Sequence, residues 1–275
     1  MPAIQSWFQY RDGNGDALPQ GQPEAGTPPG TGPPSLNVEY LSRFEDVDVP
    51  LEITRSADPA TSSTSDSSLA PNFTRTEAPL STFLSYISHL QSTPSLLPTT
   101  TRIYLAQCPI SLLPATLAST LPTPLYALSA GRGDIYDSSI WLGLAPTLTP
   151  LHKDPNENVF VQLAARKVVR VFEPAVGAEM FAAALRGAGG GGMSMGLGEE
   201  MMSVEGEGGR VLNEIVWGND VVVVGEEETG KVGSKAIGYE AVLEAGDGMF
   251  VPKGWWHSVR GVGEGIVGSA NWWFR

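Results

Sequence analysis

Short apolar runs separated by glycine and proline recur along this chain, and they restrict the fold more than any other feature. Clear examples are VVRVF at 168–172 and VVVV at 221–224. The chain contains 32 glycines and 22 prolines, residues that favour turns. Few stretches show helical periodicity. Many short strands joined by turns predict a mainly β chain arranged as a sandwich or jelly roll.

The N-terminal region differs in composition from the rest of the chain. Residues 11–36 are rich in glycine and proline and predict a disordered linker. We therefore expect an N-terminal segment over residues 1–37 and one domain over 38–275. A helix is expected over 79–90, where apolar residues recur at helical spacing, namely Leu80, Phe83, Leu84, Ile87 and Leu90. The glycine-rich and acidic stretch at about 187–210 predicts a flexible insertion and lacks a phosphate-binding pattern.

Charge and targeting signals restrict the partners and the location. The net charge of −13 counts against attraction to a phosphate backbone and favours a basic polypeptide as partner. The first residues lack a secretory signal, and no apolar run is long enough to span a bilayer. The single cysteine, Cys108, cannot form an intramolecular disulfide. We expect a cytoplasmic or nuclear protein without a membrane segment.

One pair of residues points to metal chemistry. His152 and Asp154 stand two residues apart, so on an extended strand their side chains project to the same side. His257, in an apolar and aromatic setting, can supply a third ligand. Two histidines and a carboxylate form the facial triad of non-haem Fe(II) oxygenases. Zinc is less favoured, although this ligand set does not exclude it.

Three segments carry a family resemblance. They are TPLHKDPNENVFVQLAARK at 149–167, DGMFVPKGWWHSV at 247–259 and SANWWFR at 269–275. Together they resemble the JmjC family, specifically its small cupin-type hydroxylases, and the resemblance extends from about Leu36 to Arg275. It implies a double-stranded β-helix, also called a jelly roll or cupin, with a few flanking helices. It also implies that His152, Asp154 and His257 are catalytic metal ligands for Fe(II).

The same resemblance assigns residues to a 2-oxoglutarate pocket. Thr149, Lys167 and Tyr104 match the positions that contact the distal carboxylate of this co-substrate, and Asn158 and Asn271 match amides that line the pocket. The assignment is physically reasonable because a buried dicarboxylate needs a cation and hydroxyl donors.

The resemblance implies an Fe(II)- and 2-oxoglutarate-dependent dioxygenase that uses O2, most simply to hydroxylate a protein side chain. Three alternatives stay open: an RNA (tRNA) hydroxylase, a lysine or arginine demethylase of the same family, and a non-catalytic cupin-type binding module. The acidic charge makes nucleic acid the weaker substrate candidate. The sequence specifies neither the prime substrate nor the oligomeric state.

Overall fold

Two sheets form the body of the protein. The computed structural model describes residues 1–10, 32–55, 72–93, 101–130, 132–187, 207–218, 221–224 and 236–275. Most of the expected linker at 11–36 and of the expected insertion at 187–210 therefore lies outside the described residues. Within the described ranges, no helix is long and apolar enough to cross a membrane.

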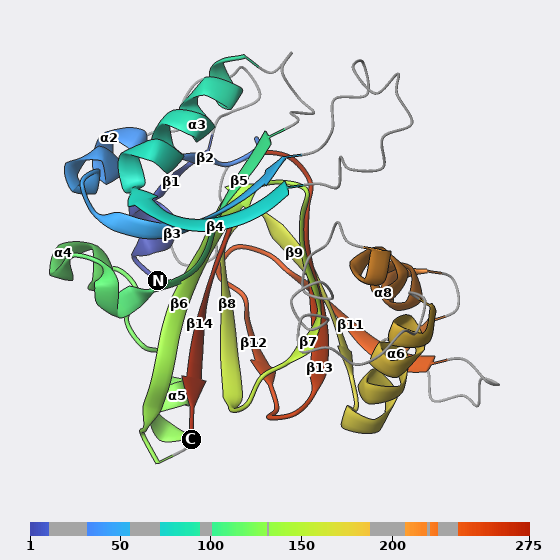
Figure 1. Ribbon diagram of the computed structural model, residues 1–275. Helices are drawn as coiled ribbons and strands as arrows, with labels where there is room; N and C mark the ends of the chain where they lie inside the picture. Colours follow the sequence, from blue (N-terminus) through green and yellow to red (C-terminus); the bar gives the residue numbers. More distant parts are fainter. Residues whose placement is uncertain are drawn as a thin grey trace, which may run out of the picture.

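The larger sheet has seven strands, all paired antiparallel (Figure 1). Across the sheet, its strands are β12 (Gly248–Val251), β8 (Glu157–Ala164), β14 (Ile266–Phe274), β6 (Ile135–Leu144), β5 (Thr101–Pro109), β3 (Asp48–Arg55) and β4 (Asn72–Pro79). Strand β14 is buried along its whole length, as expected for a central strand covered on both faces.

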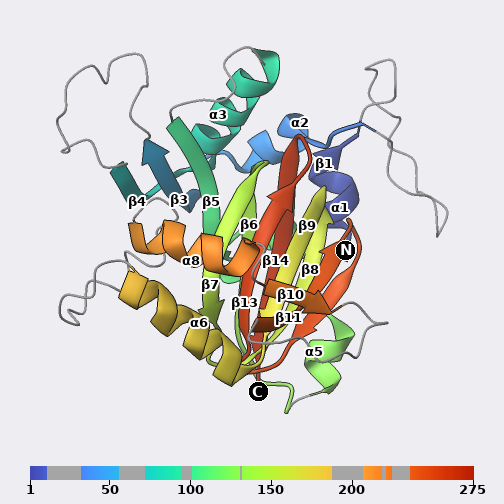
Figure 2. The same cartoon turned by 90° about the vertical axis from the view of Figure 1, so that its right-hand side faces the viewer.

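The smaller sheet has five strands. In order, they are β10 (Val221–Val224), β11 (Ala236–Leu243), β9 (Arg166–Phe172), β13 (Trp256–Val262) and β7 (Thr147–Lys153). The chain alternates between the sheets: β7 leads into β8 of the larger sheet, β8 into β9, β12 into β13, and β13 into β14. In Figure 2 the strands of the two sheets overlap along the line of view. The prediction of a mainly β jelly roll of the cupin type is confirmed.

The outer face of the larger sheet is covered by short helices and by the N-terminal segment. Trp7 and Phe8 are buried in this core, and β1 (Phe8–Gln9) pairs with β2 (Ser35–Leu36). The helices on this side are α1 (Ala3–Ser6), α2 (Val38–Leu41), η1 (Ser42–Phe44), α3 (Leu80–Ser92), η3 (Ile110–Leu112), α4 (Ala115–Ala118) and α5 (Leu125–Ser129). The apolar stripe expected over 79–90 is buried in α3. The proposed domain boundary near residue 38 stays a prediction.

Two further helices cover the outer face of the smaller sheet. Helices α6 (Pro174–Gly187) and α8 (Glu207–Trp217) pack against each other, on the opposite side of the molecule from α2, α3 and α4 (Figure 1). Helix α8 begins within the last residues of the expected insertion and was not predicted. Its apolar residues Leu212 and Val216 join Met180, Phe172 and Trp256 in a second core.

A glycine allows α6 to approach the smaller sheet closely. A Cβ atom at Gly177 would lie 2.1 Å from Cγ of Trp256. Gly177→Ala is therefore expected to lower the free energy of unfolding by about 1–3 kcal/mol, through overpacking. The sign is diagnostic, because alanine in place of glycine normally stabilises an exposed helix by ~1 kcal/mol. Thermal unfolding checks this.

Gly248→Ala is the matched control for Gly177→Ala. A Cβ atom at Gly248 would meet only the Phe160 carbonyl oxygen, at an ordinary 3.7 Å. We expect its melting temperature to stay close to that of the wild type. An unchanged or higher melting temperature for Gly177→Ala would show that α6 does not need this close approach.

Candidate metal centre

The candidate site lies at one end of the space between the two sheets. His152 is at the end of β7 and His257 is at the start of β13, and these strands pair so that the two residues face each other. Partners in an antiparallel pair project to the same face of a sheet. Asp154 follows β7 directly, in the turn that leads to β8. The fold therefore brings His257 next to His152 and Asp154, which are already close to each other in the sequence.

The three side chains offer donor atoms that all lie within 4.8 Å of one another. His257 Nε2 is 3.6 Å from Asp154 Oδ2, and the two imidazole centroids are 4.1 Å apart. Two ligand atoms at right angles around a metal, each ~2.1 Å from it, lie about 3 Å apart. Side-chain rotation on metal binding would have to bring the donor atoms to that spacing. His257 is buried, whereas His152 and Asp154 are half-buried, so the cluster is open on one side.

Backbone carbonyls orient both imidazole rings. His152 Nδ1 lies 2.9 Å from the Pro150 carbonyl oxygen, and His257 Nδ1 lies 3.4 Å from that of Trp255. A proton on Nδ1 of each ring leaves the Nε2 lone pair free for a metal. Burial, followed by the neighbouring His152, lowers the pKa of His257 well below its usual range. His257 is then neutral, so its contact with Asp154 is not an ion pair. The two side chains lie close together as two candidate ligands of one metal.

An amide chain orients the carboxylate. Asn158 Nδ2 donates to Asp154 Oδ2 at 2.8 Å, and Asn271 Nδ2 donates to Asn158 Oδ1 at 3.0 Å. Both asparagines are buried, and they come from β8 and β14 of the larger sheet. Of the two residues expected in a co-substrate pocket, Asn158 thus bonds the candidate metal ligand directly and Asn271 is linked to it through Asn158.

Lys167 is a buried cation in the same interior. Only 3% of its surface is exposed, and its ammonium group donates to Ser269 Oγ at 2.7 Å and lies 5.3 Å from the Phe160 ring. Burial lowers the pKa of Lys167 to about 7. Among the described residues, no carboxylate pairs with it. Sequence reasoning missed Ser269, which is two residues before Asn271 on β14.

Tyr104 and Thr149 contribute to the walls by their strand positions. Tyr104 on β5 packs over β6 at Gly143, where a Cβ atom would lie 2.3 Å from the tyrosine ring. Burial raises the pKa of the Tyr104 hydroxyl. Thr149 pairs with Val259 of β13. Within the described ranges, neither side chain makes a hydrogen bond to Lys167 or to the three candidate ligands.

Other buried polar atoms that sequence reasoning missed face the same interior. Ser139 Oγ, Gln162 Oε1 and Trp273 Nε1 have no hydrogen-bond partner among the described residues. Ser139 pairs with Asn271, and Gln162 with Ser269, so both lie on the face that carries the site. The sequence signal that could have identified them is a polar residue within an otherwise apolar strand segment.

Comparison with known proteins assigns most of the chain to a family. Residues 31–275 match the family described as the cupin-like domain. The chain belongs to the cupin-like domain family. Its resemblance to the JmjC type, stated from the sequence, is confirmed by this match together with the relatives below.

Curated relatives of this cupin-like chain include two named lysine-specific demethylases. Lysine-specific demethylase JMJ30 of Arabidopsis thaliana is 25% identical over 170 residues, which cover 62% of this chain and 33% of that protein. Lysine-specific demethylase 8 of Xenopus tropicalis is 25% identical over 122 residues, 44% of this chain and 21% of that protein. The chain therefore spans about a third or less of the length of these relatives.

Proposed function

We propose that this domain is an Fe(II)- and 2-oxoglutarate-dependent dioxygenase that hydroxylates a protein side chain. The observation that carries the proposal is the convergence of His152, Asp154 and His257, with their donor atoms within 4.8 Å. Support comes from the family match and from relatives named as demethylases.

The donor set fits Fe(II). Two neutral imidazoles and one carboxylate form the facial arrangement that leaves open positions on a six-coordinate metal. His152, Asp154 and His257 would hold the ion, and their orienting contacts are the kind that tune metal ligands. Zinc in a four-coordinate site would use the same residues but leave one open position.

The interior also fits a dicarboxylate co-substrate. A buried ammonium group without a carboxylate partner is costly, and an anion beside Lys167 would remove that cost. Lys167, Thr149 and Tyr104 would hold the distal carboxylate of 2-oxoglutarate, while Asn158 and Asn271 line the pocket. Ser139 Oγ and Trp273 Nε1, which have no partner among the described residues, offer further hydrogen bonds.

Iron, 2-oxoglutarate and O2 together would supply the oxidising chemistry for C–H hydroxylation, which amino-acid side chains cannot supply. The chain's own residues would bind the metal and the co-substrate, orient the metal ligands and shield the interior from water. Asn158 fixes the Asp154 carboxylate, the Pro150 carbonyl fixes the His152 ring, and the two sheets keep water from the interior around Lys167.

A protein substrate is favoured over a nucleic acid. The net charge of −13 repels phosphate backbones and attracts basic polypeptides. Lysine demethylation is the second candidate, supported by the names of the relatives. Both reactions begin with hydroxylation of a C–H bond, so the same site serves either. A location in the cytoplasm or the nucleus follows only as part of this proposal.

Turnover of 2-oxoglutarate tests the proposed function. Purified protein with Fe(II), ascorbate and O2 is expected to convert 2-oxoglutarate to succinate slowly without a prime substrate, and His152→Ala is expected to abolish this. His89→Ala is the control, because His89 is exposed on α3, away from the interior. A wild type that neither binds iron nor forms succinate would favour the non-catalytic binding module instead.

Substrate class is tested by mass spectrometry of material incubated with the active enzyme. A peptide that gains one oxygen supports hydroxylation, and loss of a methyl group with release of formaldehyde supports demethylation. Modified RNA without any modified peptide would contradict the choice of a protein substrate.

A further inference from the structure

The paired residues His152 and His257 lie next to an irregularity in the pairing of β7 with β13. Strand β13 pairs with β7 at His257↔His152 and then at Val259↔Thr149, with a register shift between. One residue of β13, Ser258, thus stands opposite two residues of β7, Pro150 and Leu151. Pro150 has no backbone N–H to donate, so the ladder is weakened where the ring of His152 is oriented.

A side-chain hydrogen bond bridges the strands at this irregularity. Ser258 Oγ donates to the Thr149 carbonyl oxygen at 2.8 Å, and Ser258 is fully buried. Trp217 Nε1 in turn donates to Ser258 Oγ at 3.0 Å. Because an indole N–H can only donate, it leaves the serine proton directed at Thr149. The chain from Trp217 through Ser258 to Thr149 therefore has one defined direction.

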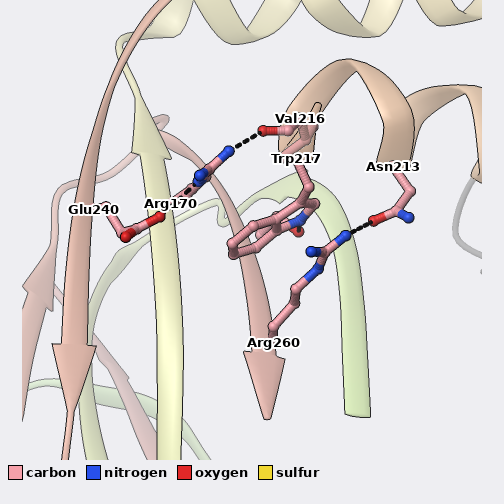
Figure 3. Close-up of polar contacts among 7 residues, drawn as sticks. Arg170, Asn213, Val216, Trp217, Glu240 and Arg260 are labelled. Atoms are coloured by element: carbon pink, nitrogen blue, oxygen red, sulfur yellow. Dashed lines mark hydrogen bonds and ion pairs between the residues drawn. The ribbon is translucent and has the colours of Figure 1, made fainter. Parts of the chain in front are cut away.

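Trp217 is the last residue of α8, and two arginines fix it (Figure 3). The guanidinium groups of Arg170 and Arg260 lie 4.6 and 4.2 Å from its ring centroid. Arg170 also donates to the Val216 carbonyl oxygen at 2.9 Å, and Arg260 donates to Asn213 Oδ1 at 2.9 Å. A cation that binds the final carbonyls of a helix stabilises the helix end. The indole is thus held rigidly on the outer face of the smaller sheet.

Packing connects the same helix to the neighbours of both histidines. Leu212 and Val216 of α8 share a buried cluster with Leu151 and Trp256, which directly precede His152 and His257. Helix α8 therefore shares a packed cluster with residues of both ligand-bearing strands and hydrogen-bonds to one of them, β13, from the side opposite the candidate metal.

We infer that α8 positions the two histidine ligands through the Trp217–Ser258–Thr149 hydrogen-bond chain. The inference rests on the proposed metal site. Trp217 and Ser258 are positioning residues that contact no metal or substrate. Helix α8 then sets the geometry of the site from the outer side of the smaller sheet, independently of which substrate enters from the open side.

Cobalt(II) binding tests the inference. The full chain is titrated with Co(II) without oxygen, and the visible absorption of the bound ion is followed in the wild type, Trp217→Phe, Ser258→Ala and the double variant. Each single change is expected to weaken Co(II) binding by up to about 10-fold and to shift the absorption bands. Ten-fold is the low end for residues that hydrogen-bond a metal ligand directly, and this chain acts on the ligands one residue further away. The double variant should bind no more weakly than the weaker single variant, since all three break one chain.

Trp7→Phe is the matched control. It removes the same atoms from a buried indole whose Nε1 has no hydrogen-bond partner in the described part of the chain. Its Co(II) affinity and spectrum should equal those of the wild type. If Ser258→Ala does not fold, Trp217→Phe alone tests the inference, because Trp217 is only half-buried at the helix end.

The outcomes separate this inference from the proposed function. Wild-type affinity and spectrum in Trp217→Phe and Ser258→Ala, or additive losses in the double variant, would overturn the inference while leaving the metal site intact. No Co(II) binding by the wild type would overturn the metal site, and the inference with it.

Discussion

Replacing Lys167 with methionine is expected to stabilise the protein without ligands at pH 7 and to abolish 2-oxoglutarate binding. Lys167 is 3% exposed, and its ammonium group has no carboxylate partner among the described residues. Methionine fills similar space without the cost of burying a charge. The same substitution removes the only cation proposed to bind the distal carboxylate. Opposite signs for stability and binding are the signature of a site whose buried cation serves to bind an anion.

The stability of the wild type should also depend on pH through Lys167. Its pKa is lowered from 10.5 to about 7 in the folded state. Between those values the unfolded chain binds a proton that the folded chain does not, so stability rises with pH, by at most about 1.4 kcal/mol per unit. Below pH 7 the full cost of the buried charge persists. Lys167→Met should lack this rise.

Urea unfolding at pH 7 and pH 9, together with calorimetric titration of 2-oxoglutarate in the presence of Mn(II) without oxygen, measures both effects. Lys253→Met is the control, because Lys253 is exposed. A Lys167→Met variant that is less stable than the wild type at pH 7 would show that the lysine is already compensated, and would remove the basis for an anion pocket.

Replacing Asp154 with alanine is expected to abolish metal binding. Asp154 supplies the only negative charge of the triad, and without it two neutral imidazoles must hold a divalent ion alone. A metal present at 100 times its Kd stabilises the wild type by about 2.7 kcal/mol. The melting temperature of the wild type should therefore rise with Mn(II), whereas that of Asp154→Ala should not.

Glu157→Gln provides the comparison for Asp154→Ala. Glu157 is a half-buried carboxylate at the start of β8, close in sequence to the triad but outside it. It should keep the full metal-induced rise in melting temperature. An equal loss in both variants would mean that general negative charge attracts the ion, instead of one coordinated carboxylate.

The strand and helix patterns could be predicted because they depend on local sequence. Leu80, Phe83 and Ile87 repeat at helical spacing and are buried in α3. His152 and Asp154 are two residues apart, so any extended backbone places them on one side. The choice of His257 as their partner rested on its apolar and aromatic setting and on the family resemblance, because only the register of β7 and β13 brings it to His152.

The parts that were missed depend on tertiary contacts. Ser269 looks like any small residue of a buried strand until β9 and β14 face each other and Lys167 reaches it. Helix α8 follows a glycine-rich stretch, and its stability comes from packing and from the Trp217 contacts more than from intrinsic propensity. Trp7 and Phe8 occupy the core of the larger sheet, although a glycine-rich and proline-rich segment separates them from the domain.

The alternation of the chain between the two sheets also bears on how the candidate centre comes into existence during folding. His152 and His257 come together only when β13 pairs with β7. All strands from β8 to β12 lie between these two strands in the sequence. Closing so long a loop costs chain entropy that no local contact repays. A nascent or partly folded chain therefore has only the neighbouring His152 and Asp154 to offer an ion. High-affinity metal binding at the proposed site would then be a late event that coincides with native sheet closure.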